Sequence, residues 1–320
     1  MNVEFLKYLA DPDTGAELEL IDAAYDGQRV HSGILKSPTN QFPIVDGVPR
    51  FVEHQAYTNS FGFEWTRWPR LQFDSENIGK AMEGYSTRMW EQVTCHTDNL
   101  KNQLVVDVGC GPGRFIEVAR QKQGRVIGID YSLAVDAAYQ NFLHDPEVLI
   151  CQADALKLPL KPGIVNASFS IGVLHHLPEP VKGLAEMTRI LAPEGWTSIC
   201  VYEKSGYYNY PNVQLWRAIF AYLAKVFGYY PALLYSFCTV YGLRFLDWVP
   251  SLRKLVKIFF PYISLPDIRW SILDTFDSIT PQHQSAHTTE EVQRWFVDTG
   301  LSSIKQTPWG STAFKGYRRT

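Results

Sequence analysis

A glycine-rich turn constrains the fold of this chain more than any other feature of its sequence. The run VVDVGCGPGRF at residues 105–115 joins an apolar, strand-like segment to a helix-like one. A junction of this kind lets a ligand lie against backbone N–H groups. Strand, turn and helix patterns then alternate as far as Glu203, which predicts a parallel sheet with helices on both faces.

Three acidic residues distinguish between the ligands that such a turn can bind. A dinucleotide fingerprint needs a third glycine where this chain has Arg114, and Asp107 would repel a pyrophosphate. Asp130 ends the second predicted strand, where a carboxylate can accept hydrogen bonds from ribose hydroxyls. Asp154 ends the third, in a position to meet an adenine amino group. The acids therefore describe a ligand with an amine, a ribose and an adenine but no phosphate.

Five segments in order over residues 103–203 resemble the class I S-adenosylmethionine-dependent methyltransferase family. They are DVGCGPGRF, VIGIDYS, QADALKLPL, SFSIGVLHHLPEP and EMTRILAPEGWTSICVYE. The resemblance implies an α/β fold with a doubly wound, mostly parallel, seven-stranded Rossmann-like sheet and an antiparallel terminal strand. It also implies S-adenosylmethionine as the cofactor, S-adenosylhomocysteine as its product, and an acceptor near the ends of strands four and five.

The resemblance also assigns roles to residues, position by position. The cofactor-binding candidates are Asp107, Gly109, Cys110, Gly111, Gly113, Asp130, Tyr131, Ser132, Asp154, Ala155, Gly172 and Val173. The catalytic candidates near the transferred methyl group are His175, His176, Tyr202, Asp277 and His287. A general base is needed only if the acceptor carries a proton when it attacks. Packing or ordinary loop polarity is the alternative role for each of these five side chains.

Residues 1–53 form short β-like runs and predict a small β-rich module. The module resembles the zinc-ribbon-like domain that activates some methyltransferases, in which two C-x-x-C pairs bind zinc. The pair positions here are Asp11 with Thr14 and Ser37 with Asn40, so no thiol remains. Hydroxyl and amide groups are poor zinc ligands, and we expect no metal. An unrelated β-rich cap is the alternative.

The remaining segments complete the predicted organisation. Residues 54–100 are expected to be a helical, aromatic connector and cap, and 101–206 with 271–320 the methyltransferase core. Residues 207–270 hold 18 aromatic side chains, seven basic residues and two acidic ones. A helical aromatic lid over the acceptor site is the favoured interpretation of this insert. A membrane-spanning helix and peripheral membrane contact, the latter through the basic segment around residues 253–260, are the alternatives.

Composition limits the partners and the compartment. The formal net charge of -3 gives no global basic field for nucleic acid, so none is expected as a partner. Five scattered cysteines without a C-x-x-C pair, and an N-terminus unlike a signal peptide, predict a cytoplasmic protein, with membrane association as the alternative. We expect methyl transfer to a hydroxyl or amine of a small, lipid-like or natural-product metabolite. A non-catalytic partner protein, other chemistry with the same cofactor, and a dinucleotide oxidoreductase are the rival functions.

Overall fold

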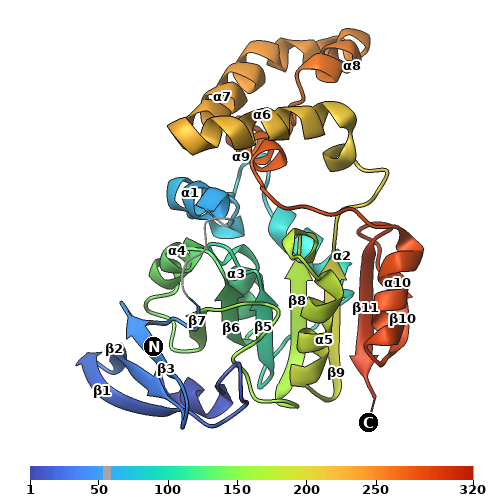
Figure 1. Ribbon diagram of the computed structural model, residues 1–320. Coiled ribbons are helices and arrows are strands. Elements are labelled where there is room, and N and C mark those ends of the chain that lie inside the picture. Colours follow the sequence, from blue (N-terminus) through green and yellow to red (C-terminus); the bar gives the residue numbers. More distant parts are fainter. Residues whose placement is uncertain (53–58, 320) are drawn as a thin grey trace.

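The computed structural model describes residues 1–52 and 59–319 and has a seven-stranded sheet at its centre (Figure 1). The strand order is β10-β11-β9-β8-β5-β6-β7. Strands β5 to β9 run parallel, and β11 is antiparallel to both of its neighbours. The predicted α/β fold and its antiparallel terminal strand are confirmed. The strands are β5 (Leu104–Val108), β6 (Arg125–Asp130), β7 (Val148–Gln152), β8 (Val165–Ile171), β9 (Leu191–Cys200), β10 (Leu301–Gln306) and β11 (Ala313–Arg318).

Alternating side chains of the strands build a core on each face of the sheet. Val105 belongs to one core and Val106 to the other, because successive side chains of a strand point to opposite faces. The first face is covered by α2 (Tyr85–Thr94), α3 (Arg114–Gln121) and α4 (Ala134–Asn141). The second is covered by α5 (Pro180–Ile190) and α10 (Thr289–Asp298). Thr288 caps α10 through a capping box with Glu291, as the sequence HTTEE predicts.

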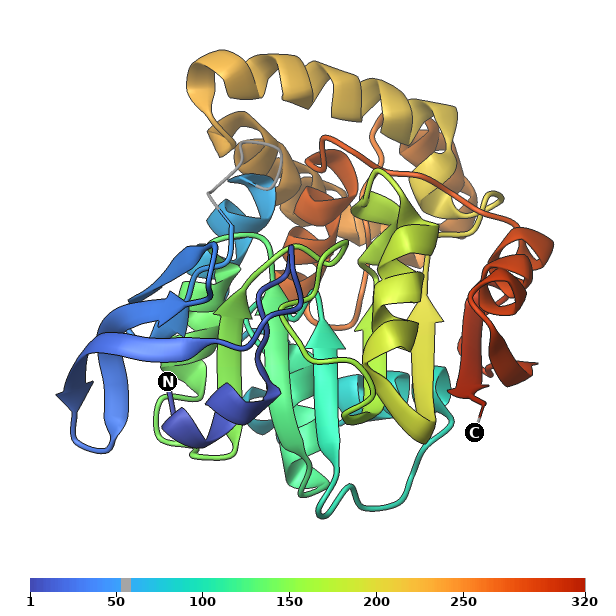
Figure 2. The same ribbon diagram turned by 60° about the horizontal axis from the view of Figure 1, so that its bottom comes forward.

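The N-terminal module is a four-stranded antiparallel sheet at the β7 edge, opposite the C-terminal strands (Figure 2). Its strands are β1 (Glu19–Asp26), β2 (Arg29–Lys36), β3 (Gln41–Val45) and β4 (Val48–Pro49), preceded by the 3₁₀ helix η1 (Val3–Tyr8). Phe5, Leu9 and Leu35 are fully buried in the same core as α5 and α10. The module therefore packs against the central sheet, where burial of its apolar side chains stabilises it.

The four positions that resemble a zinc site lie together in the module. Asp11 accepts hydrogen bonds from Ser37 Oγ at 2.5 Å and Asn40 Nδ2 at 3.0 Å. It also accepts from the backbone N–H groups of Asp13 and Thr14, at 2.9 and 3.2 Å. A buried carboxylate with four donors thus joins the two turns. Within the described residues, no group of three or more His, Cys, Asp or Glu side chains is arranged to hold a metal ion.

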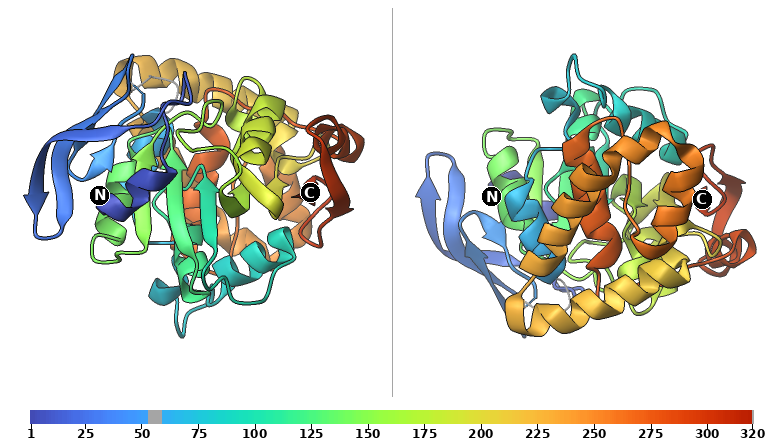
Figure 3. Two further views of the ribbon diagram at one scale, coloured as in Figure 1. Left: turned by 90° about the horizontal axis from the view of Figure 1, so that it is seen from below. Right: turned by 90° about the horizontal axis from the view of Figure 1, so that it is seen from above.

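The aromatic insert lies beyond the carboxyl ends of the parallel strands. Its helices α6 (Pro211–Phe227), α7 (Tyr230–Leu243) and α8 (Pro250–Phe259) form an outer layer (Figure 1). Helix α9 (Ile268–Ile279) packs beneath α6 and α7, and the view from above shows this group over the sheet (Figure 3). Asp277, one of the catalytic candidates, belongs to α9. Among the described residues, no helix is long and apolar enough to cross a membrane.

The predicted connector begins with residues 54–58, which lie outside the described part of the chain. After them comes α1 (Asn59–Arg67), which supplies aromatic side chains to the space beneath the insert. The remaining elements of the described residues are short 3₁₀ helices. They are η3 (Asp74–Glu76), η4 (Leu174–His176), η5 (Tyr207–Asn209) and η6 (Arg244–Trp248).

Candidate active site

The glycine-rich turn follows β5, where the strand order of the sheet reverses. Gly109 and Gly113 have backbone φ angles of +81° and +96°, a conformation that residues with a side chain rarely adopt. A Cβ atom at Gly109 would lie 2.3 Å from Val173 Cγ1, and one at Gly113 would lie 2.3 Å from Phe142 Cε2. Packing within the chain therefore requires glycine at both positions. Ligands of open α/β sheets bind at such a reversal of strand order.

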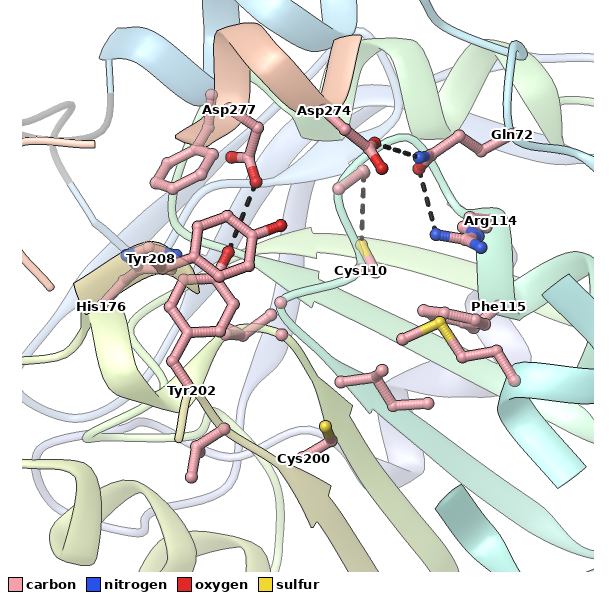
Figure 4. A pocket seen from close by; sticks show the side chains of 18 of the residues that line it. Gln72, Cys110, Arg114, Phe115, His176, Cys200, Tyr202, Tyr208, Asp274 and Asp277 are labelled. Atoms are coloured by element: carbon pink, nitrogen blue, oxygen red, sulfur yellow. Dashed lines mark hydrogen bonds between the residues drawn. The ribbon is translucent and has the colours of Figure 1, made fainter. Parts of the chain in front are cut away.

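A cavity of about 520 Å³ lies between this turn, the ends of β8 and β9, and the helices above them (Figure 4). Its volume lies within the usual range of small-molecule sites. It contains candidates for both cofactor and acceptor. The predicted site residues that line it are Gly109, Cys110, Gly111, Asp130, Tyr131, Ala155, Gly172, Val173, His176, Tyr202 and Asp277.

The other predicted site residues lie outside this lining. They are Asp107, Gly113, Ser132, Asp154, His175 and His287. Asp107 is 1% exposed, and its Oδ2 has no hydrogen-bond partner among the described residues. Burial, and then the charge of Asp130, raise the pKa of Asp107 well above its ordinary value. Asp107 therefore supports the turn from beneath. A positively charged group nearby would lower the pKa of its carboxyl and favour the ionised form.

Asp130 connects the glycine turn to the turn that follows β6. Its Oδ2 accepts a hydrogen bond from the Gly111 N–H at 2.9 Å. Its Oδ1 accepts from the backbone N–H and the hydroxyl of Ser132, at 2.8 and 2.7 Å. Oδ2, with the one bond from Gly111, therefore retains capacity for a further hydrogen bond. Asp130 can thus hold the turn in place and still bind a ligand hydroxyl.

His176, Tyr202 and Asp277 meet at the side of the cavity beneath the insert (Figure 4). The Tyr202 hydroxyl donates to Asp277 Oδ2 at 3.4 Å, and His176 Nδ1 lies 2.8 Å from the His283 carbonyl oxygen. Burial lowers the pKa of His176 to about 4, so its imidazole is neutral at pH 7. Burial raises the pKa of Asp277 to about 6, although the Arg217 charge and the Tyr202 hydroxyl oppose this shift.

His175 and His287 support this group from outside the cavity. The His175 ring stacks on Tyr202 with centroids 3.6 Å apart, and it is completely buried. Burial, followed by the charge of His176, lowers the pKa of His175 well below its ordinary value. His287 lies 2.8 Å from the Ser285 hydroxyl and packs against Trp295. Neither imidazole lies on the cavity wall, so in this arrangement each can only position other groups.

Several polar residues on the cavity wall were not singled out from the sequence as site candidates. They include Glu64, Gln72, Arg114, Tyr208 and Asp274. Arg114 had served only to exclude a dinucleotide fingerprint. The other four follow no motif, and all but Asp274 lie in segments that the sequence treated as cap or insert.

Arg114 follows the glycine turn directly in the sequence and is the first residue of α3. Its Nε donates to Ser86 Oγ at 2.9 Å and its Nη1 to Gln72 Oε1 at 3.2 Å. Its buried Nη2 has no partner among the described residues. Burial lowers the pKa of Arg114 to about 10, so it remains charged at pH 7. A ligand carboxylate would provide the missing partner for Nη2.

Comparison with known proteins matches the part of the chain that contains the glycine turn to a family domain. A family model described as a methyltransferase domain matches residues 106–199. The mouse probable tRNA methyltransferase 9B is 31% identical over 131 residues, covering 40% of this chain and 28% of that protein. The tRNA U34 carboxymethyltransferase of Pseudoalteromonas atlantica is 31% identical over 132 residues, covering 40% and 41%. The chain thus spans less than half the length of these curated relatives.

The chain is also similar to solved structures of low sequence identity. One is a complex of the Haloferax volcanii Trm112 methyltransferase activator with a methyltransferase, at 14% identity and a TM-score of 0.46 over 81% of this chain and 98% of that one. Another is an S-adenosylmethionine-dependent methyltransferase from Thermotoga maritima, at 14% identity and a TM-score of 0.45 over 82% and 99%.

The names of the relatives correct one expectation from the sequence. We expected no nucleic-acid partner because the net charge is -3, yet the similar curated proteins include tRNA methyltransferases. That expectation is wrong as an inference, because the net charge of a whole chain averages over its surface. Nucleic acid is contacted by a local surface, which can be basic on a chain that is acidic overall.

Proposed function

We propose that this chain, which carries a class I S-adenosylmethionine-dependent methyltransferase domain, transfers the methyl group of S-adenosylmethionine to a hydroxyl or amine of an acceptor. One observation carries the proposal. A single cavity joins the glycine turn and Asp130 to His176, Tyr202 and Asp277. Cofactor and acceptor can therefore lie side by side, with the acceptor beneath the aromatic insert acting as a lid.

The residues around the glycine turn fit this cofactor. The backbone from Gly109 to Gly111 and the side chains of Asp130 and Tyr131 would hold its nucleoside part, beside Ala155. The unpartnered Nη2 of Arg114 offers a charge for the carboxylate of its amino-acid part. When bound, the cofactor supplies an electrophilic methyl group on a sulfonium. We propose that no metal takes part in this binding.

The residues beneath the lid fit an acceptor that must lose a proton. Because the Tyr202 hydroxyl donates to Asp277, its oxygen can accept a hydrogen bond from an acceptor O–H or N–H. A carboxyl with a pKa of about 6 is largely ionised at pH 7.5 and can take up that proton. Because Nδ1 of neutral His176 donates to the His283 carbonyl oxygen, its Nε2 can accept a hydrogen bond beside Asp277. Binding both partners in one cavity supplies alignment.

The relatives favour a second candidate function, in which the acceptor group belongs to a tRNA nucleoside. Its support is the similarity to the probable tRNA methyltransferase 9B and to the tRNA U34 carboxymethyltransferase. Under this proposal a group attached to a nucleoside of the tRNA, and not a free metabolite, would reach Tyr202 and Asp277. The chemistry at the methyl group would be the same.

Calorimetric titration tests the proposal first. We expect S-adenosylmethionine and S-adenosylhomocysteine to bind at micromolar concentrations, before and after treatment with EDTA, and NADH not to bind. Transfer of a labelled methyl group to bulk tRNA or to small amines and alcohols then separates the two acceptor classes. Failure of both sulfur ligands to bind would refute the proposal and favour a non-catalytic partner protein. Binding without methyl transfer to any acceptor would favour other chemistry with the same cofactor.

A further inference from the structure

Three carboxyl groups face the lid side of the cavity. Asp274 and Asp277 lie one turn apart on α9, and Glu64 comes from α1. Glu64 is 1% exposed, and neither of its carboxylate oxygens has a hydrogen-bond partner among the described residues. Burial, and then the charges of Asp277 and Asp274, raise the pKa of Glu64 well above its ordinary value. The three acids are therefore close enough to repel one another.

The chain neutralises these acids only in part. Burial raises the pKa of Asp274 and Asp277, and the charges of Arg114 and Arg217 partly oppose this shift, whereas no cation among the described residues offsets the burial of Glu64. Arg114 donates to Ser86 and Gln72, and Arg217 donates to the Ser278 carbonyl at 2.8 Å. A buried carboxylate that lacks a partner destabilises a folded chain unless a cation or a proton compensates it. A cationic ligand would provide the positive charge that this wall of the cavity lacks.

Aromatic rings complete the same part of the cavity. Tyr202 and Tyr208 stack with centroids 4.0 Å apart and planes 1° apart, and Phe61 and Trp65 of α1 also line the space. Phe61 and Trp65 flank Glu64 on the helix, and the Phe61 ring lies 5.1 Å from that of His176. Faces of aromatic rings attract ammonium groups, and more strongly where water is excluded. An anionic acceptor would instead meet three acids.

We infer that the acceptor is an amine that binds as its ammonium form, held by Glu64, Asp277 and the surrounding aromatic rings. The ammonium then gives one proton to the Asp277 carboxylate, which frees the nitrogen lone pair that accepts the methyl group. This inference rests on the proposed function, because the amine must lie beside the bound cofactor. The ammonium would replace the missing partner of Glu64, while Asp274, bonded to Gln72 Nε2 at 3.3 Å, would contribute charge from the neighbouring turn of α9. A hydroxyl acceptor would bring no positive charge, so Glu64 would have to stay protonated beside it.

Three probes with one shape and different charges test the inference on the full chain. Calorimetry is performed at saturating S-adenosylhomocysteine with phenethylamine, phenethyl alcohol and 3-phenylpropionate, and with spermidine as a second amine. We expect at least one amine to bind at least tenfold more tightly than the alcohol, and the carboxylate not to bind. Glu64→Gln should weaken amine binding at least tenfold and change the affinity for S-adenosylhomocysteine less than twofold. Glu290→Gln, at an exposed position of α10, is the matched control.

The possible outcomes distinguish a failure of this inference from a failure of the proposed function on which it rests. If S-adenosylhomocysteine does not bind, the proposed function itself fails. If it binds but neither amine does, or if Glu64→Gln binds the amine normally, the amine inference fails alone. Tighter binding of the carboxylate would also overturn it, and would favour an acceptor like the carboxymethyl group named for a relative.

Discussion

The prediction with the clearest magnitude concerns Asp11, whose carboxylate joins the two turns of the N-terminal module. In Asp11→Ala, the side chains of Ser37 and Asn40 lose their charged acceptor. Hydrogen bonds to a charged group contribute about 1.5–3 kcal/mol each. The backbone donors of Asp13 and Thr14 are closer to water, so we count only the two side-chain bonds. We expect the free energy of unfolding to fall by about 4 kcal/mol.

The assay is thermal unfolding followed by circular dichroism, with Asp13→Ala as the control from the same turn. Asp13 is exposed, and its salt bridge with Lys157, at 2.6 Å, lies at the surface. Such pairs contribute about 0–1 kcal/mol, so the control should unfold almost as the unaltered chain does. For Asp11→Ala we expect the midpoint to fall by roughly 8 °C, at about 2 °C per kcal/mol.

The pH dependence provides a second measurement on the same group. Burial alone would raise the pKa of Asp11, but hydrogen bonds from Ser37, Asn40 and two backbone amides together outweigh it and lower the pKa below 3.8. A carboxyl with a lower pKa in the folded state stabilises the fold above the unfolded value, and this contribution is lost as the pH falls through the folded value. Asp11→Ala should therefore differ most from the unaltered chain at neutral pH. An unchanged midpoint for Asp11→Ala, or a large drop after EDTA treatment of the unaltered chain, would refute the idea that this hydrogen-bonded cluster takes the place of a metal.

Three further predictions concern the cavity. Burial raises the pKa of Asp274 to about 7 and of Asp277 to about 6, so between about pH 4 and 7 the folded chain binds protons that the unfolded chain has released. The unfolding midpoint of the ligand-free chain should thus fall as the pH rises through this window, and Asp274→Asn should weaken the trend; a midpoint that rises would contradict it. Asp130→Ala should bind S-adenosylhomocysteine more than tenfold more weakly by calorimetry, and unchanged binding would remove the ribose role. Tyr202→Phe should lower kcat at least tenfold in the methyl-transfer assay with unchanged cofactor affinity, and an unaltered kcat would exclude Tyr202 from proton transfer.

Local patterns in the sequence were sufficient to predict the central sheet. Apolar runs that end in glycine or an acid, such as 104–109 and 125–130, specify buried parallel strands before any long-range contact forms. Helix α9 was not anticipated, because its apolar and polar side chains follow no single stripe. Trp270, Ile272, Leu273 and Phe276 are all buried, since α9 is enclosed by α6, α7 and the cavity. A helix covered on several sides has no amphipathic pattern to detect.

The prediction of site residues from local sequence patterns has the same limit. Candidates that follow strands, such as Asp130 and Tyr202, lie on the cavity wall because the carboxyl ends of parallel strands meet at one edge of the sheet. Glu64 could not be recognised in this way. Its segment reads as an exposed acid among aromatic residues, and only the packing of α1 against α9 buries it. Chemistry that depends on two distant helices leaves no local signal in the sequence.

The N-terminal module affects the site through the edge strand that it covers. Arg50, just after β4, contacts Asp136 and donates to Gln152 Oε1 at 3.0 Å. Gln152 in turn donates from Nε2 to the carbonyl oxygen of Tyr131, at 2.9 Å, and Tyr131 lines the cavity. The module therefore supports the turn after β6 from the side opposite the cavity. A module without thiols at these four positions can still serve the domain, because burial and hydrogen bonding can hold β7 and this turn in place without a metal.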